Sequence, residues 1–424
     1  MPLSLSSRDQ EMLEGRHGPA KKLAMSIVVR MAEVYGATEL LDIRGAHIDG
    51  SIYQGEASLE FAERLASLGG KVVVPTSMNI GSFDEIHGGQ WERVPAEWAD
   101  KSQRIMRAYI QMGCIPTWTC APYQAGVRPK LGEHVVWAES NAIVFANSVL
   151  GARTNRYGDY IDICAALVGR APRSGLHLTE NRYGQLLVRL VGVPAALLRD
   201  DSLYPVLGYL VGLLAGERIP VIEGLPKETT EDQLKALGAA AASAGAIPMF
   251  HAVGITPEAP DLATAFGGRE PPEVHQVGMP ELRAARAELS TTAADRLDLV
   301  ILGSPHFSLP EFRALIPRLV GKRRHPRVQF IVTTSRFVLG ELERQGLLSP
   351  LEAFGVRLMT DTCILNFPTV QNDRGVTVCM TNSGKYAHYI PGQIGKQVIY
   401  GSTADCVASA VAGRVVRDDT LWNA

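Results

Sequence analysis

Short runs of apolar residues recur along the chain, and each run stops at a polar loop. Runs of this length without polar alternation predict strands that are buried on both faces, as in parallel sheets. The expected strands, each with the loop that follows it, are residues 71–74 with PTSMN, 247–251 with AVGITPEAP, 297–302 with GSPHFS, 328–332 with TTSR, 356–359 with TDTC, and 376–380 with TNSGKYAHY.

Helical patterns lie between these runs. Residues 56–68 place Leu59, Ala62 and Leu65 on one face, together with Ala66, and the pattern stops at two glycines. Thr230 precedes Gln233 by three positions, and Ser308 precedes Glu311 by three, which predicts two helix starts of the capping-box type. Alternating strands and helices predict an α/β fold with mostly parallel sheets flanked by helices. Ligands of such folds bind at the carboxyl ends of strands.

The length of 424 residues, with 46% hydrophobic residues, predicts more than one domain. The expected subdivision is 1–185, 186–290 and 291–424. The proline-rich stretch 257–272 is the loosest part of the chain, and it is expected to be a long loop or a boundary.

The charge pattern excludes several classes of partner. A formal net charge of -2 favours neither nucleic acid nor an anionic membrane surface. The longest apolar region, 186–215, is interrupted by Arg189 and by residues 199–201, so no membrane span is expected. Six scattered cysteines and a polar N-terminus without an apolar signal segment predict a cytoplasmic protein.

Two cysteines lie on polar loops that follow or end apolar stretches. Cys120 follows TWT, and Cys363 follows TDT. Thiolates on separate strand ends are typical of a metal centre that several loops assemble, whereas a buried cysteine is otherwise a small apolar side chain. Both interpretations stay open for this pair. The other four cysteines lie in apolar or helical runs, where packing is expected.

Further polar residues are candidates for chemistry. Ser383 lies two positions before Lys385, which would favour deprotonation of the serine, but a helix N-cap and a solvated lysine explain the same spacing. His47 and Asp49 are expected on a glycine-rich loop. This loop is either a ligand site or a turn with a surface histidine. Several polar residues within apolar sequence indicate either a ligand or an internal hydrogen-bond network: Glu139, Asn141, Asn147, Thr154 and Asn155.

Eight segments together resemble the large, catalytic part of the aconitase X family. They are GAHIDG (45–50), GEASLEFAERLASLGGKVVVPTSMN (55–79), TCAPY (119–123), AESNAIVFANSVLGARTNR (138–156), GLHLTENR (175–182), GSPHFS (303–308), TDTC (360–363) and TNSGKYAHY (381–389).

The resemblance implies an aconitase-like α/β architecture with the active site at strand ends between subdomains, an iron–sulfur centre and a dehydration reaction. It also implies a small swivelling domain. The chain ends at Ala424, soon after the KYAHY segment, so that domain is expected on a separate small subunit, with the present chain as the large subunit of a heteromer.

The sequence departs from the family pattern at one position. Ser304 stands where many members carry cysteine. Cys120 and Cys363 match the cluster ligands of the family. Ser304 or another group as third ligand, a cluster of lower nuclearity and a mononuclear iron all remain open.

The resemblance implies a hydro-lyase that acts on a small carboxylate, with cis-3-hydroxy-L-proline converted to 1-pyrroline-2-carboxylate as the leading hypothesis. Ser383 is the expected base, assisted by Lys385, with a serine of the small subunit as competitor. The expected substrate-orienting residues are His47, Ser77, Asn79, Asn155 and Arg182. Dehydration of mevalonate 5-phosphate is the alternative, with Arg153, Arg156, Arg182 and Lys385 as its phosphate site. A non-catalytic partner subunit with a decayed site is a further alternative.

Overall fold

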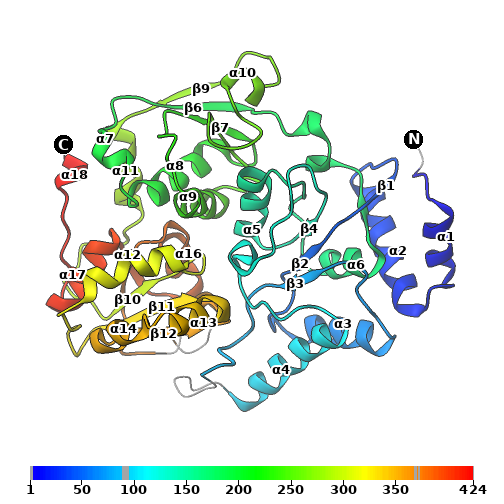
Figure 1. Cartoon of the computed structure of the whole chain (residues 1–424), viewed down its shortest axis with the longest axis horizontal. Coiled ribbons are helices and arrows are strands. Elements are labelled where there is room, and N and C mark those ends of the chain that lie inside the picture. Colours follow the sequence, from blue (N-terminus) through cyan, green and yellow to red (C-terminus); the bar gives the residue numbers. More distant parts are fainter. Residues whose placement is uncertain (1–2, 88–94, 367–369, 371–372, 424) are drawn as a thin grey trace. The chain divides into compact units, whose positions relative to one another are not determined.

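The computed structural model describes residues 3–87, 95–366, 370 and 373–423 (Figure 1). The chain forms two compact units: the first contains residues 1–83 and 94–183, and the second contains residues 84–93 and 184–424. Residues 84–93 therefore belong to the second unit, although the chain on both sides of them belongs to the first.

The first unit is built around a parallel sheet of three short strands. The central strand is β2 (Ala46–Ile48), which lies between β3 (Thr76–Met78) and β4 (Val136–Trp137), with Ile48 opposite Met78. An antiparallel pair, β1 (Leu40–Asp42) and β5 (Arg170–Pro172), lies in the same unit. The helices are α1 (Ser7–Glu14), α2 (Pro19–Val34), α3 (Glu56–Ser67), α4 (Ala96–Gln111), α5 (Ser140–Phe145) and α6 (Ile161–Val168), with short helical turns at Pro122–Ala125, Ala146–Leu150, Gly175–His177 and Thr179–Asn181.

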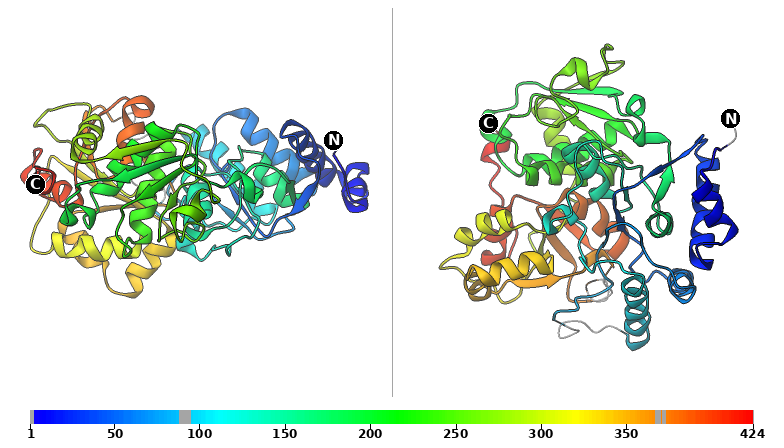
Figure 2. Two further views of the ribbon diagram at one scale, coloured as in Figure 1. Left: turned by 90° about the horizontal axis from the view of Figure 1, so that it is seen from above. Right: turned by 45° about the vertical axis from the view of Figure 1, so that its right-hand side comes forward.

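Apolar faces of these helices form the core of the first unit. Met25 and Val28 of α2 are buried with Ile163 and Leu167 of α6. The blue helices α1 and α2 lie against each other in both views of Figure 2. Burial of such side chains stabilises the unit by roughly 1.5–3 kcal/mol for each large aliphatic residue.

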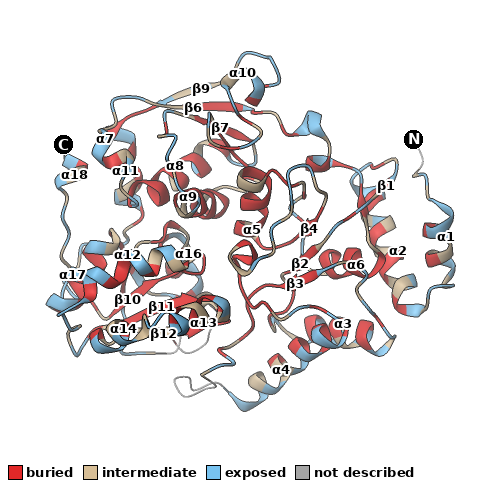
Figure 3. Ribbon diagram, viewed as in Figure 1, coloured by how far each residue is buried: buried red, intermediate tan, exposed pale blue. Residues whose placement is uncertain are grey.

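The second unit contains two parallel sheets. The first has the order β8-β7-β6-β9, with β6 (Leu186–Leu190), β7 (Pro220–Glu223), β8 (His251–Ala252) and β9 (Val274–Val277). The second has the order β12-β11-β10-β13-β14, with β10 (Leu299–Leu302), β11 (Gln329–Thr334), β12 (Arg357–Thr360), β13 (Val378–Thr381) and β14 (Gln397–Tyr400). Strands β10 and β11 are buried along almost their whole length (Figure 3).

Helices connect these strands. They are α7 (Ala195–Leu198), α8 (Leu203–Ala215), α9 (Glu231–Ala244), α10 (Leu262–Ala265), α11 (Met279–Glu288), α12 (Leu309–Leu319), α13 (Arg336–Arg344), α14 (Leu348–Phe354), α16 (Gly384–Ile394), α17 (Thr403–Ala412) and α18 (Thr420–Asn423), with a short helical turn at Ile364–Asn366. Helix α9 packs against α8 and α16. No described helix has the length and hydropathy needed to cross a bilayer.

Most expected elements are confirmed. Four of the six expected strands coincide with β10, β11, β12 and β13, and both capping boxes are present at α9 and α12. The expected strand 71–74 is wrong. The backbone N–H groups of Val72 and Val73 donate to the carbonyls of Met112 and Ala166, near the ends of two helices. The pairing strand begins later, at Thr76. The expected strand 247–251 is paired only from His251, as the start of β8.

The order of the five-stranded sheet determines where its loops converge. From β10 the chain passes to β11 and β12 on one side, and then to β13 and β14 on the other. The direction therefore reverses between β10 and β13. In open parallel sheets this is the position at which ligands bind, outside the carboxyl ends of the strands.

Candidate functional site

The first unit carries polar side chains at the carboxyl edge of its parallel sheet. His47 of β2 lies opposite Ser77 of β3, with its Nδ1 atom 2.8 Å from Ser77 Oγ. Two residues further along the chain from His47 and Ser77 lie Asp49 and Asn79, and Asn79 Nδ2 donates to Asp49 Oδ1. The parallel register therefore produces two adjacent polar pairs from segments about 30 residues apart.

His47 is fully buried, and this decides its charge. Burial lowers the pKa of His47 to about 4, although the Glu139 carboxylate and the Thr119 backbone oppose the shift. Its Nε2 atom makes no hydrogen bond of standard geometry with a described residue. The imidazole is therefore neutral near pH 7 and presents either a donor or an acceptor at Nε2, depending on the tautomer.

A group of buried carboxyl groups adjoins Asp49. Asp162, at the start of α6, accepts from the backbone N–H of Asp49 at 2.8 Å and from that of Ile163 at 2.6 Å. Burial raises the pKa of Asp162 to about 7, and the nearby Asp159 carboxylate adds to the shift. Burial likewise raises the pKa of Asp49 to about 8, with Asp159 and Glu139 adding to it and Asn79 opposing it.

Cys120 lies on a segment that extends the sheet beyond β3. Thr117 is the anchor, because its Oγ1 atom donates to the Met78 carbonyl at 2.7 Å and accepts from the Met78 N–H at 2.9 Å. The Cys120 carbonyl accepts from Asn141 Nδ2 at 3.0 Å, and the Cys120 side chain is 8% exposed. Trp118 has a φ of +45°, a strained value that turns the chain towards this position.

Asn155 and Arg182 lie elsewhere in the first unit and hold loops together. Arg182 is buried and donates to Asn147 Oδ1 and to the backbone carbonyls of Asn147, Ala152 and Leu176, at 3.0–3.1 Å. Asn155 donates to Ser174 O and accepts from Leu176 N. This geometry favours a structural role for both residues over the expected contact with substrate.

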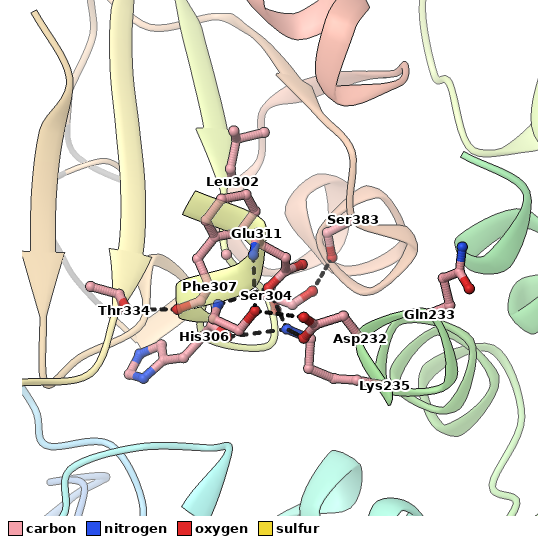
Figure 4. A network of polar contacts seen from close by, with 12 residues as sticks. Asp232, Gln233, Lys235, Leu302, Ser304, His306, Phe307, Glu311, Thr334 and Ser383 are labelled. Atoms are coloured by element: carbon pink, nitrogen blue, oxygen red, sulfur yellow. Dashed lines mark hydrogen bonds and ion pairs between the residues drawn. The ribbon is translucent and has the colours of Figure 1, made fainter. Parts of the chain in front are cut away.

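In the second unit, Ser304 and Ser383 lie at the point where the strand order reverses. Ser304 follows β10, Ser383 follows β13, and Ser383 Oγ donates to the Ser304 carbonyl at 2.5 Å (Figure 4). Gly303 makes this turn possible, because its φ is +97° and an added Cβ would lie 2.1 Å from the Thr333 carbonyl oxygen. The Ser304 side chain is half-buried.

Ser383 is also the N-cap of α16. Its Oγ atom accepts from the Tyr386 N–H at 3.1 Å, so the cap explanation of its spacing to the helix is confirmed. Lys385, in the first turn of that helix, is half-buried. Its expected effect on Ser383 stays a prediction.

The loop that carries Cys363 is fixed by three independent contacts. Asp361, at a φ of +63°, accepts two hydrogen bonds from the guanidinium of Arg336, at 2.7 and 3.0 Å. Asp84 accepts from the Thr360 N–H at 3.0 Å and from its hydroxyl at 2.8 Å. His306 Nε2 lies 3.0 Å from the Thr362 carbonyl. Cys363 Sγ, half-buried, then lies 3.6 Å from the hydroxyl of Tyr386.

A buried ion network supports the other side of the Ser304 loop (Figure 4). Lys235 of α9 is 2% exposed, pairs with Asp232 at 2.8 Å, and also pairs with Glu311 of α12. Ser308 Oγ donates to Asp232 at 2.7 Å, and its N–H donates to Glu311 at 2.8 Å. Asp232, Lys235 and Glu311 line a cavity of about 80 Å³ together with Ser304 and Ser383.

The six cysteines differ in their surroundings. Cys114, Cys164, Cys379 and Cys406 are packed in the cores, and burial raises the pKa of each thiol. Within the described part of the chain, no three His, Cys, Asp or Glu side chains form a metal-binding group. Cys120 lies on a loop of the first unit, and Cys363 and Ser304 lie on loops of the second unit.

Sequence reasoning left several residues of this region without a role. Asp84, Arg336 and Asp361 fix the Cys363 loop, and Lys235 supports the Ser304 loop. Asp361 directly precedes the TC pair in the sequence, which was a usable signal. Asp84 had no such signal, since its partner lies 276 positions away.

Family models match nearly the whole chain. They are described as the first domain of aconitase X, over residues 2–180, the second domain, over 184–287, and the third domain, over 297–412. The crystal structure of Thermococcus kodakaraensis aconitase X in its holo-form matches with a TM-score of 0.86 and 32% identity, and the match covers 96% of this chain and all of that one.

Curated relatives carry two names. A cis-3-hydroxy-L-proline dehydratase of Pseudomonas aeruginosa is 49% identical over 99% of this chain and 72% of the relative, and one of Hypocrea jecorina is 45% identical over 97% and 69%. A phosphomevalonate dehydratase large subunit of Methanothermobacter thermautotrophicus is 37% identical over 93% of this chain and 96% of the relative. With these matches over all three parts of the sequence, the chain belongs to the aconitase X family.

Proposed function

We propose that this chain is the large subunit of an iron-dependent hydro-lyase that dehydrates cis-3-hydroxy-L-proline to 1-pyrroline-2-carboxylate. The observation that supports the substrate is the 49% and 45% identity to two dehydratases of that name, against 37% or less to the phosphomevalonate enzymes. The relatives named large subunits support a small partner subunit, because this chain aligns with 96% of the length of one of them.

The reaction removes a proton from the carbon next to the carboxylate and a hydroxyl from the adjacent carbon. A base, an acid for the leaving group, and polar groups that stabilise the enolate-like charge are therefore needed. Cys120, Cys363 and Ser304 are the residues proposed to hold iron, either as a cluster or as a single ion. Bound iron acts as a Lewis acid towards the leaving oxygen.

Ser383 remains the proposed base, and its geometry sets a condition. Its proton is donated to the Ser304 carbonyl, and its lone pair accepts from the Tyr386 N–H. Ser383 takes up a substrate proton only after losing its own, which an ammonium group at Lys385 would favour. A serine of the small subunit stays the competing base. His47, Ser77 and Asn79 are proposed to orient the substrate.

The alternative, dehydration of mevalonate 5-phosphate, has less support from the structure. A dianionic phosphate requires several unengaged cations. Arg182 directs its donors to carbonyls and Asn147, and Arg153 donates to the His177 carbonyl at 3.0 Å and to Thr179 Oγ1 at 2.8 Å. Two of the four cations expected for that pocket are therefore committed to the protein itself.

Co-expression with a candidate small subunit and purification without oxygen test the proposal. The complex is assayed with cis-3-hydroxy-L-proline and with mevalonate 5-phosphate, and its iron content is measured. Turnover of the amino acid alone is expected. Turnover of the phosphate alone would replace the substrate, and a complex without iron and without either activity would support a decayed partner subunit.

A further inference from the structure

Asp49 differs from Asp162 and Glu139 in having one carboxylate oxygen without a hydrogen bond. Its Oδ1 atom accepts from Asn79 Nδ2, while no described residue forms a hydrogen bond with Oδ2. The residue is half-buried, so Oδ2 remains within reach of a small molecule. In contrast, Asp162 binds backbone N–H groups with both oxygens, and Glu139 caps α5 through the N–H of Ala142 at 2.7 Å.

The surroundings of Asp49 hold negative and neutral groups from every adjacent element. Asp159 and Asp162 face it from the α6 side, Glu139 follows β4, and His47 of β2 is neutral near pH 7. No described lysine or arginine forms an ion pair with Asp49, and these carboxyl groups form no metal-binding set. A carboxyl group among other carboxyl groups, without a cation, keeps its proton.

A second observation indicates that this edge receives a ligand. The Asn79 Oδ1 atom is buried and has no hydrogen-bond partner among the described residues, because the amide is oriented by its donation to Asp49. An unpaired buried acceptor is destabilising, and a donor group of a bound substrate would satisfy it. Tyr109 OH is also buried and unpaired, and it lies beside Gly50 and Asp159.

We infer that Asp49 is the acid that protonates the leaving hydroxyl in the dehydration proposed above, and that Asn79 is its positioning residue. The inference rests on the proposed function. The proton of Asp49 Oδ2 passes to the substrate hydroxyl, the carbon–oxygen bond breaks, and water leaves. The proton on the neighbouring carbon passes to the base, and its bonding electrons form the double bond. Asp49 is left as a carboxylate that Asn79 stabilises through Oδ1, and solvent returns the proton.

A substrate with a leaving group that needs no proton provides the test. In cis-3-fluoro-L-proline the carbon–fluorine bond breaks with its electron pair, and fluoride leaves as the anion. For the wild-type complex, kcat/KM for hydroxyproline is expected to fall above pH 8, where Asp49 loses its proton, while fluoride release shows no such fall.

Variants separate the roles. Asp49→Asn keeps an acceptor for Asn79, and it is expected to lower dehydration by about 100-fold or more while fluoride release changes by less than about threefold. Asp159→Asn is the matched control: it is expected to keep dehydration, with the alkaline fall moved to lower pH because a negative neighbour is gone.

Equal loss of both reactions in Asp49→Asn, or dehydration close to the wild-type rate, would overturn the inference. The wild-type pH comparison needs no substitution, so it decides the matter even where the variant fails to fold: an identical alkaline fall for both substrates would overturn it. A wild-type complex that leaves hydroxyproline unchanged would instead overturn the proposed function.

Discussion

Individual residues show how far side-chain chemistry can be predicted without the fold. The spacing of Ser383 and Lys385 allowed a base or an N-cap, and only the structure shows the cap. Arg182 had the charge expected of a carboxylate ligand, but loops that are far apart in the sequence supply its carbonyl partners. In contrast, the placement of Cys363 after a strand, and of four other cysteines in the cores, followed from local polarity, whereas Cys120 has no strand directly before it and is buried.

Cys363→Ala is expected to lower the iron content of the anaerobically purified complex well below one atom per chain, together with its activity. The reason is the small number of thiols outside the cores. Cys379→Ala is the control, because Cys379 lies in β13 and contributes only packing. Iron analysis and visible absorption make the comparison. Full iron content in Cys363→Ala would remove this cysteine from the proposed ligands.

Arg182→Leu is expected to destabilise the protein by roughly 3 kcal/mol or more, because several buried carbonyls lose a charged donor. Thermal unfolding measures the effect. A contact with substrate would instead raise KM and leave Tm unchanged, so the pair of measurements distinguishes the two roles.

Elements were predictable where a local pattern determined them. The helix that begins at Ser308 needed only its capping box and apolar face, and the strands of the five-stranded sheet needed only their apolar runs. Residues 71–74 have the same composition as a strand, yet their N–H groups pair with carbonyls near helix ends. Pairing partners at long range decide such cases, and no local pattern contains them.

Segment 84–87 is expected to control how firmly the Cys363 loop is held. Asp84→Ala removes both acceptors of Thr360 and leaves its buried N–H without a partner. The expected result is faster loss of iron to a chelator, with the chain still folded. Glu85→Gln is the control, since the Glu85 contact with Arg336 is longer, at 3.3 Å, and more exposed. Equal rates of iron loss for the two variants would argue against this role.

At the scale of the whole molecule, part of the pH dependence of stability is expected to come from Asp49 and Asp162 of the first unit. The pKa values of Asp49 and Asp162 are about 8 and about 7 in the folded chain, above the value near 4 of an unfolded aspartate. On these two groups the folded state therefore holds more protons between pH 4 and their folded pKa values. Their contribution to stability falls as pH rises through this window, by about 1.4 kcal/mol per pH unit for each proton, whereas buried His47 contributes the opposite slope below about pH 6.5.

Thermal unfolding from pH 6 to pH 9 measures this slope, and Asp49→Asn is expected to flatten it. An unchanged slope in that variant would assign the dependence to other groups. The division into units itself was beyond sequence analysis, because Asp84 and Glu85 contact residues of the second unit more than 200 positions later.

The long separation in sequence between Asp84 and Thr360 affects the order in which parts of the protein can fold during synthesis. Asp84 leaves the ribosome 276 residues before Thr360, its hydrogen-bond partner. At about 5–20 residues per second, the interval is roughly 14–55 s. Throughout that time the first unit can assemble around its own sheet, while Asp84 still lacks its partner Thr360. The loop of Cys363 is therefore expected to take its final form only near the end of synthesis, so the proposed iron would be loaded after that point.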